Sequence, residues 1–189
     1  MTKERVLLHV CCAPCSMNVI EELKHDYFVE LLFYNPNIHP AEEYYKRKQE
    51  VVRYSGALNI KFHDMDFHPE EFYSRIEGLE NEKEGGIRCQ ECFRIRLQKT
   101  ALKAQELGIT LFTTTLTVSP HKKSGIIFTI ADEITNHSGI TFLKKDFKKK
   151  DGFKKTMQLA KANDIYIQNY CGCEFSLSPD RMLTLAAKK

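Results

Sequence analysis

Short apolar runs alternate along most of the chain with longer segments in which apolar residues recur every three or four positions. The short runs are typical of buried strands and lie at residues 5–10, 28–34, 59–65, 109–117 and 140–143. The longer segments have helical spacing and lie at residues 17–24, 41–54, 69–76, 89–107, 125–135 and 154–162. Gly108 follows the longest of them, where a helix commonly ends.

This order of elements predicts an α/β fold, in which a parallel sheet has helices on both faces. The runs at 6–10 and 109–116 do not alternate apolar with charged residues, as expected of strands that are covered on both sides. A chain of 189 residues suits one domain spanning residues 1–189. We expect its last part, after residue 162, to be a helical or loop segment.

Three unusual motifs follow predicted strands. Cys11-Cys12 ends the first strand, Asn35-Pro36-Asn37 ends the second, and Ser119-Pro120-His121 follows the fourth. Ligands of parallel sheets bind beyond the carboxyl ends of the strands. The three motifs are therefore expected to meet at one edge of the sheet and to form a site there.

The cysteines change this picture more than the net charge of +3 does. Their number is odd, and they fall into tight clusters, unlike the cysteines of a secreted disulfide scaffold. The chain has seven, which are Cys11, Cys12, Cys15, Cys89, Cys92, Cys171 and Cys173. The first apolar run is too short for a signal peptide or a membrane span. We expect a cytoplasmic protein, without a membrane segment, whose thiols bind metal or carry out redox chemistry.

Cys89 and Cys92 form a C-x-x-C motif at the predicted start of a helix, where the helix N-terminus stabilises thiolates. For this motif alone, half of a metal site, a thioredoxin-like couple and a chance occurrence all remain open, and a metal site is about as expected as the other two together. Together with Cys11 and Cys12 it supplies four thiolates, the usual complement of a [4Fe–4S] cluster. Structural zinc also takes four cysteines, but adjacent cysteines suit its usual paired knuckles poorly.

Two further sets of thiols are less determined. Cys15 is left over and is either a plain buried cysteine, a thiol beside the cluster, or a ligand of an additional iron or other divalent metal. Cys171-Gly172-Cys173 can close only a small and strained disulfide ring, which is typical of a labile redox couple. The alternative is a second pair of metal ligands, and we favour the redox couple.

A basic stretch lies at residues 142–155 and contains seven lysines and two aspartates. Such a patch can hold a phosphate backbone, although a solvated surface is the more ordinary interpretation of the same composition.

Six motifs in order resemble those of the epoxyqueuosine reductase QueH family, over most of the chain. The residues that carry the resemblance are His9–Cys15 (HVCCAPC), Tyr34–Arg47 (YNPNIHPAEEYYKR), Gly85–Leu97 (GGIRCQECFRIRL), Thr113–Lys122 (TTTLTVSPHK), Asp146–Phe153 (DFKKKDGF) and Tyr166–Ser176 (YIQNYCGCEFS).

The resemblance implies a Rossmann-like fold of the nucleotide-hydrolase or PP-loop type. It implies a [4Fe–4S] cluster on Cys11, Cys12, Cys89 and Cys92 and a catalytic, redox-active pair at Cys171 and Cys173. The implied reaction is the cobalamin-independent reduction of epoxyqueuosine to queuosine, at the wobble position of transfer RNA with a GUN anticodon. This step ends queuosine biosynthesis. An unidentified ferredoxin- or flavodoxin-like protein would supply the electrons.

Two other functions fit parts of the sequence. A PP-loop ATP-dependent transfer RNA thiolase shares the fold type, but the segment after the first strand here is Cys-Cys-Ala-Pro-Cys, without the glycines of a phosphate-binding loop. A non-catalytic zinc module that binds RNA would use the cysteines as structural ligands.

Overall fold

The computed structural model describes residues 3–177. Its centre is a five-stranded sheet with the order β3-β2-β1-β4-β5. All neighbouring strands are parallel. The strands are β1 (Glu4–His9), β2 (Tyr27–Phe33), β3 (Phe62–Asp64), β4 (Leu111–Thr114) and β5 (Thr141–Phe142). The predicted α/β fold with a parallel sheet is confirmed.

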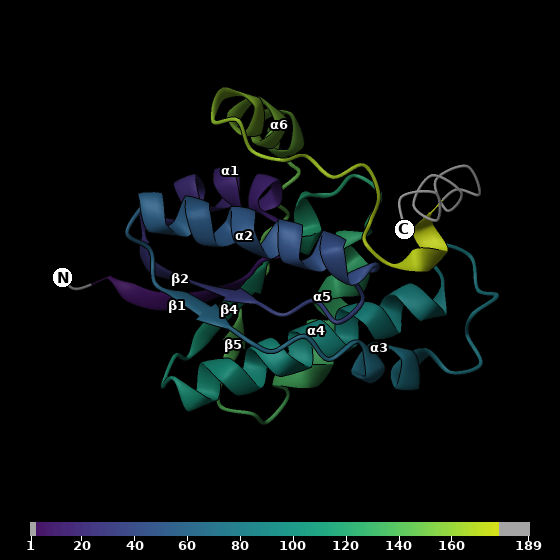
Figure 1. The fold of residues 1–189 in the computed structure, drawn as a ribbon. Helices are drawn as coiled ribbons and strands as arrows, with labels where there is room; N and C mark the ends of the chain where they lie inside the picture. Colours follow the sequence, from purple (N-terminus) through teal and green to yellow (C-terminus); the bar gives the residue numbers. More distant parts are fainter. Residues whose placement is uncertain (1–2, 178–189) are drawn as a thin grey trace.

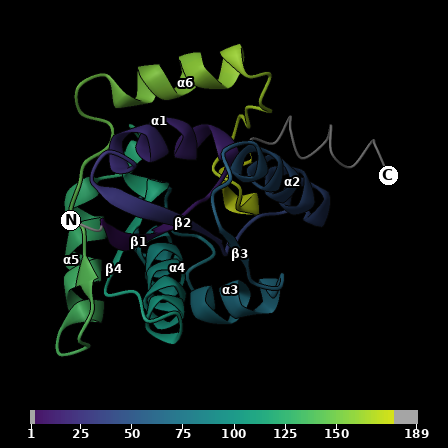
Figure 2. The same cartoon turned by 90° about the vertical axis from the view of Figure 1, so that its left-hand side faces the viewer.

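Helices cover both faces of this sheet (Figures 1 and 2). One face carries α1 (Ala13–Leu23), α2 (Ala41–Ala57) and α6 (Gly152–Ala162). The other carries α3 (Pro69–Ile76), α4 (Ile87–Glu106) and α5 (Ser124–Thr135). A loop leads from α6 to a short 3-10 helix, η2 (Glu174–Ser176), as expected for residues 163–177; the rest of the expected C-terminal segment lies outside the described residues. No helix within residues 3–177 has the length and apolar content needed to cross a membrane.

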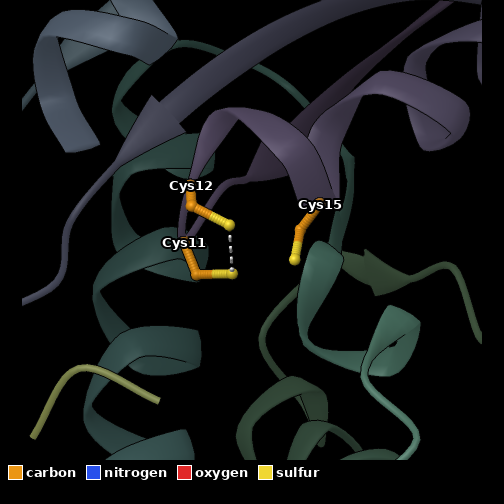
Figure 3. Close-up of side chains that lie close together, drawn as sticks. All are labelled: Cys11, Cys12 and Cys15. Carbon is orange, nitrogen blue, oxygen red and sulfur yellow. Dashed lines mark hydrogen bonds between the residues drawn. The ribbon is translucent and has the colours of Figure 1, made fainter. Parts of the chain in front are cut away.

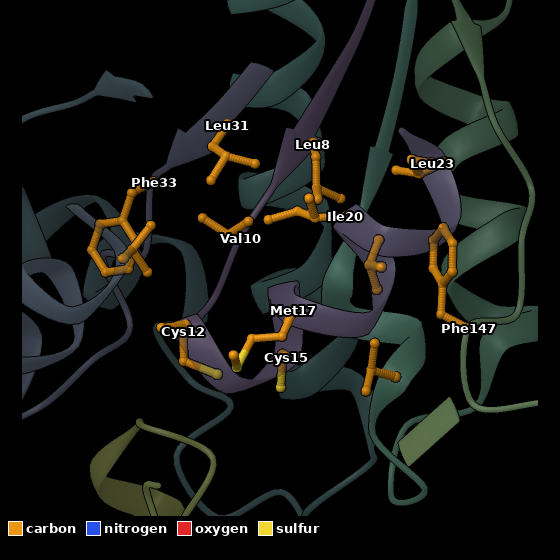
Figure 4. Packing of buried hydrophobic residues seen from close by; sticks show 14 of the residues in the cluster. Leu8, Val10, Cys12, Cys15, Met17, Ile20, Leu23, Leu31, Phe33 and Phe147 are labelled. Atoms are coloured by element: carbon orange, nitrogen blue, oxygen red, sulfur yellow. The ribbon is translucent and has the colours of Figure 1, made fainter. Parts of the chain in front are cut away.

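The central strand β1 is buried on both sides. Leu8 and Val10 pack into the core beneath α1, beside Met17 and Ile20 (Figure 4). Leu7 points the opposite way and packs into the core formed with α4 and α5. Both leucines are 0% exposed, which explains why this strand has no polar face.

Two element boundaries differ from those predicted at the site. The helix α1 begins at Ala13 rather than at residue 17, because Pro14 occupies its first turn, where proline is well tolerated. The predicted strand at 109–117 ends at Thr114 and continues as a 3-10 helix, η1 (Thr115–Val118). The Thr114 hydroxyl accepts a hydrogen bond from the Leu116 amide at 3.1 Å and so caps this turn.

Candidate functional site

The first group of thiols lies where β1 passes into α1. The Sγ atoms of Cys11, Cys12 and Cys15 all lie within 4.8 Å of one another (Figure 3). Those of Cys11 and Cys12 are 3.7 Å apart. Adjacent cysteines can face the same way here because the strand ends at His9 and the helix begins at Ala13. The early start of α1 places Cys15 in its first turn, beside the other two.

Burial limits how many of these three thiols can be ionised at the same time. Hydrogen bonds from the neighbouring thiols of Cys12 and Cys15 hold the pKa of Cys11 well below its usual value. Burial raises the pKa of Cys12 to about 12. One thiol therefore ionises readily and the next does so only at high pH, unless a cation compensates the charge. Closely grouped sulfur ligands of this kind fit a soft metal centre, such as an iron–sulfur cluster or zinc.

The second group of thiols lines a pocket between α4 and the C-terminal segment. Cys89 and Cys92 come from the first turns of α4, and Cys171 and Cys173 come from the segment before η2. Burial raises the pKa of Cys92 to about 12. All seven cysteines are free thiols. Cys89 and Cys92 do not belong to the set of sulfurs within 4.8 Å, among residues 3–177.

Two cations, the buried Arg96 and the half-buried Lys122, lie near both groups of thiols. Burial lowers the pKa of Arg96, but the negative charge of ionised Cys92, Cys171 and Cys11 outweighs this effect and raises the pKa above its usual value. Burial likewise opposes the charge of Lys122, whose pKa is raised by Cys171 and Cys11. Each cation is thus close to both groups. Negative charge on the sulfurs, from thiolates or from a cluster, is stabilised between them.

Four of the sulfurs, two from each group, accept a hydrogen bond from a donor of the protein. A donor to sulfur stabilises the thiolate form that binds metal. The pairs are Thr115 Oγ1 to Cys11 Sγ at 3.4 Å, Gln168 Nε2 to Cys12 Sγ at 2.8 Å, the Gly85 amide to Cys89 Sγ at 3.2 Å, and Arg96 Nη2 to Cys92 Sγ at 3.2 Å. These four cysteines are the ones expected to hold a cluster.

A buried arginine fixes the loop that carries the last two cysteines. Arg47 is only 2% exposed and is paired with Glu43 at 2.6 Å. It donates hydrogen bonds to the carbonyl oxygens of Cys171 at 3.1 Å and Tyr170 at 3.3 Å. The His39 amide donates to the Gly172 carbonyl at 2.8 Å. The turn between Cys171 and Cys173 is therefore held by α2 and by the loop before it.

The buried His9, the last residue of β1, lies next to the first group of thiols in the sequence and links the neighbouring strands. Burial and the charge of Arg96 lower the pKa of His9 to about 4, so its ring is neutral at neutral pH. Its ring nitrogens lie 2.9 Å from Thr114 Oγ1 and 3.1 Å from the Tyr34 carbonyl oxygen. A neutral ring that donates to this carbonyl and accepts from the hydroxyl joins the ends of three strands.

The expected meeting of three motifs at one sheet edge is confirmed. The Asn35 side chain donates to the Val10 carbonyl at 2.9 Å, next to Cys11. His121 and Lys122 line the pocket that contains Cys89 and Cys171. The sequence pointed to the cysteines but not to the polar side chains around them. Gln168, Thr115, Arg47 and Lys122 lie within motifs of the resemblance, but no spacing rule assigns them a role beside the cysteines.

Comparison with known proteins places the chain in a family. A family model described as epoxyqueuosine reductase QueH matches residues 6–179. A relative of that name from Streptococcus pyogenes serotype M1 is 38% identical, over 97% of this chain and 74% of its own length. The relative from Acinetobacter baylyi is 39% identical, over 92% of this chain and 81% of its own. The relative from Thermotoga maritima is 36% identical, over 91% of this chain and 90% of its own length.

A solved structure has a similar fold. It is the U34-tRNA thiolase NcsA from Methanococcus maripaludis with its [4Fe-4S] cluster, which matches with a TM-score of 0.61. The match covers 99% of this chain but 66% of the thiolase, at 10% sequence identity, so the likeness concerns the fold. The relatives at more than 30% identity and the family model identify the family: the chain belongs to the epoxyqueuosine reductase QueH family.

Proposed function

We propose that this protein is an epoxyqueuosine reductase, an oxidoreductase that removes the epoxide oxygen of epoxyqueuosine in transfer RNA and leaves queuosine. We further propose that Cys11, Cys12, Cys89 and Cys92 hold a [4Fe–4S] cluster. Membership of the family supports the reaction. One observation carries the assignment of the ligands: each of these four sulfurs accepts a hydrogen bond from the protein.

The protein offers what such a cluster needs. When bound, such a cluster would supply electrons one at a time. Ligands on separate irons lie farther apart than ligands of a single ion, so the two pairs need not share one 4.8 Å set. For the same reason the sulfurs of Cys11 and Cys12, 3.7 Å apart in this structure, would move apart to bind separate irons. Arg96 and Lys122 compensate the negative charge of the sulfurs.

Alanine variants of the cysteines test this ligand set. We expect Cys11→Ala, Cys12→Ala, Cys89→Ala and Cys92→Ala each to lower the iron and sulfide content after anaerobic reconstitution and to lose the brown colour. Cys15→Ala serves as the matched control and should keep the cluster. The assignment fails if Cys15→Ala loses the cluster while Cys89→Ala keeps it, because the ligands would then be Cys11, Cys12 and Cys15.

We propose that Cys171 and Cys173 form the catalytic dithiol. Removal of the epoxide oxygen as water consumes two electrons and two protons, which is what two thiols release when they close to a disulfide. Burial raises the pKa of Cys173, so this thiol keeps its proton at neutral pH. Arg96 is close to both thiols and to Cys92. The dithiol therefore lies beside a proposed cluster ligand, where it can return electrons to the site or receive them.

The remaining assignments are proposals from the chemistry of the family. The substrate would be a transfer RNA with a GUN anticodon, modified at the wobble position, and a ferredoxin- or flavodoxin-like protein in the cytoplasm would reload the dithiol. Cys15 would serve an additional iron or other divalent metal. Fully active enzyme that contains no more iron than one cluster supplies would argue against this second metal.

The two alternative functions make different predictions for the same preparation. A thiolase needs a phosphate-binding loop after β1, and the structure has the thiols of Cys11, Cys12 and Cys15 in that place. Binding of ATP by the purified protein would favour the thiolase. A colourless protein that retains zinc would favour the non-catalytic module.

A further inference from the structure

We propose that Gln168 and Thr115 are positioning residues that set the reduction potential of the cluster through their hydrogen bonds to sulfur. The inference rests on the ligand set proposed above. It goes further in assigning to each of these two side chains a measurable effect on electron transfer. The two side chains come from different segments, Gln168 from the C-terminal segment and Thr115 from η1, and they donate to different sulfurs.

The placement of Gln168 is hard to explain by packing alone. Its Nε2 atom donates to Cys12 Sγ at 2.8 Å, across 156 positions of sequence. Its Oε1 atom is buried and finds no hydrogen-bond partner among residues 3–177. A buried carbonyl oxygen without a donor is unfavourable. The side chain therefore donates to the sulfur while its own carbonyl oxygen has no donor. This arrangement is expected if the side chain is placed there for its contact with the sulfur.

A thiolate can only accept hydrogen bonds, so the amide N–H group must face it. Cys12 is only 1% exposed, so negative charge on its sulfur depends on compensating groups of the protein. Gln168 supplies one such group without adding a charge. It lies three residues before Cys171, on the segment that Arg47 anchors. The hydrogen bond thus joins the proposed dithiol segment to a proposed cluster ligand.

Thr115 makes two contacts with one residue. Its hydroxyl accepts a hydrogen bond from the Cys11 amide at 3.2 Å and donates to Cys11 Sγ at 3.4 Å. The side chain is 0% exposed, so water does not compete for either contact. The turn of η1, which begins where β4 stops early, is what brings this hydroxyl to the end of β1. The pair of contacts fixes both the backbone and the sulfur of Cys11.

The expected direction follows from charge. Reduction adds a negative charge to the cluster and its sulfurs, and a hydrogen-bond donor stabilises the more negative state. Removing a donor should therefore lower the reduction potential. At an applied potential equal to the wild-type midpoint, the ratio of reduced to oxidised cluster should fall about tenfold for Gln168→Leu, which corresponds to about 59 mV for a one-electron couple.

The experiment is a potentiometric titration of the reconstituted full-length protein, followed by electron paramagnetic resonance of the reduced cluster. Thr115→Val keeps the shape of the side chain, removes the hydroxyl and should also shift the potential downward. Thr115→Ser keeps the hydroxyl and should restore the wild-type value. Gln98→Leu makes the same substitution at an exposed position of α4 and should change nothing.

The outcomes separate this inference from the proposed function. Gln168→Leu and Thr115→Val variants that hold a full cluster at an unchanged potential would overturn the inference and leave the function intact. Wild-type protein that binds no cluster would overturn both. Should Gln168→Leu bind too little iron to be measured, the comparison of Thr115→Val with Thr115→Ser decides the matter, because these two substitutions preserve the packing volume most closely.

Discussion

At Gly172, backbone conformation and packing leave room for no side chain. Its φ angle of 126° lies in a region that residues with a side chain rarely adopt. A Cβ atom placed there would lie 3.0 Å from Arg47 Nη1 and 3.1 Å from Ile38 Cγ1. Glycine is thus required both for the turn and for the close approach of Arg47. The two flanking thiols are held in a defined turn by residues distant in sequence.

The proposed role of this turn can be tested at one atom. Cys173→Ser replaces the sulfur with oxygen, which cannot close a disulfide, and leaves the Arg47 contacts intact. We expect the variant to keep its cluster and to lose about a hundredfold of its multiple-turnover rate, in line with the loss of a group that donates protons in the reaction. Full multiple-turnover activity of Cys173→Ser would exclude the dithiol. Iron and sulfide analysis of the variant provides the control.

The cysteines could be found from the sequence because clustered thiols are rare and their spacings have few explanations. Their surroundings could not be found in this way. A glutamine three residues before a cysteine is unremarkable, and the contact from Gln168 to Cys12 exists only because the C-terminal segment returns to the end of β1. Arg96, one helical turn after Cys92, was visible as part of a motif, but its closeness to Cys11 and Cys171 was not.

Among the elements, the strands were predicted well and their ends less well. Apolar runs determine which segments are buried in the sheet, so each predicted strand is present and the alternation with helices is correct. The threonines at 113–115 have the composition of a strand. However, the neighbouring strand β5 has only two residues, which pair with Leu111 and Phe112. After Thr114 the chain forms η1, which no propensity indicates and on which the contact between Thr115 and Cys11 depends.

The edge of the sheet is held by one carboxylate. Glu30 in β2 accepts hydrogen bonds from Arg5 in β1 at 2.7 Å and pairs with His63 in β3 at 2.6 Å. Its side chain is 10% exposed. Although burial opposes ionisation, these contacts with His63 and Arg5 hold the pKa of Glu30 below its usual value of 4.5. The carboxylate thus joins three neighbouring strands, including the short edge strand β3.

The stability of this arrangement should depend on pH. Because the folded protein favours the ionised carboxyl group, its stabilisation is complete above the usual pKa and is lost as pH falls through the lower folded value. We expect Glu30→Gln to lower the free energy of unfolding by about 1–2 kcal/mol at about pH 7. The difference in the free energy of unfolding between Glu30→Gln and wild type should become smaller as the pH falls toward about 4.

Urea unfolding of both proteins in parallel across this range measures the difference, and the exposed Glu77→Gln is the matched control. A destabilisation by Glu30→Gln that stays constant with pH would show that the carboxylate charge is not responsible.

Over the whole molecule, the thiols and the cations Arg96 and Lys122 lie at the carboxyl edge of the sheet, and the basic stretch begins in the loop after β5. The loop after β5 belongs to this edge, because the Lys145 carbonyl accepts a hydrogen bond from Thr117 at 2.9 Å. Part of its charge is neutralised, since Lys144 pairs with Asp132 at 2.6 Å and Lys145 pairs with Glu22 at 2.9 Å. The exposed lysines that follow are Lys149, Lys150, Lys154 and Lys155.

These exposed lysines lead to a prediction about transfer RNA binding. Each lysine that neutralises a phosphate releases a counterion, so its removal weakens binding and lowers the dependence of affinity on salt by about 0.7–0.9 in the logarithmic slope. We expect the triple variant Lys149→Gln, Lys154→Gln and Lys155→Gln to bind transfer RNA more weakly and with a slope reduced by about 2.

A control with the same change in net charge removes three lysines at the opposite edge of the sheet, each of which pairs with a glutamate: Lys24, Lys61 and Lys103. Both variants lose the same net charge, so a general attraction between a basic protein and RNA would affect them equally. A reduced slope in the first variant alone places the phosphate contacts on the basic stretch. Equal slopes in both variants would mean that the basic stretch is an ordinary solvated surface and that the nucleic acid approaches the cysteines from elsewhere.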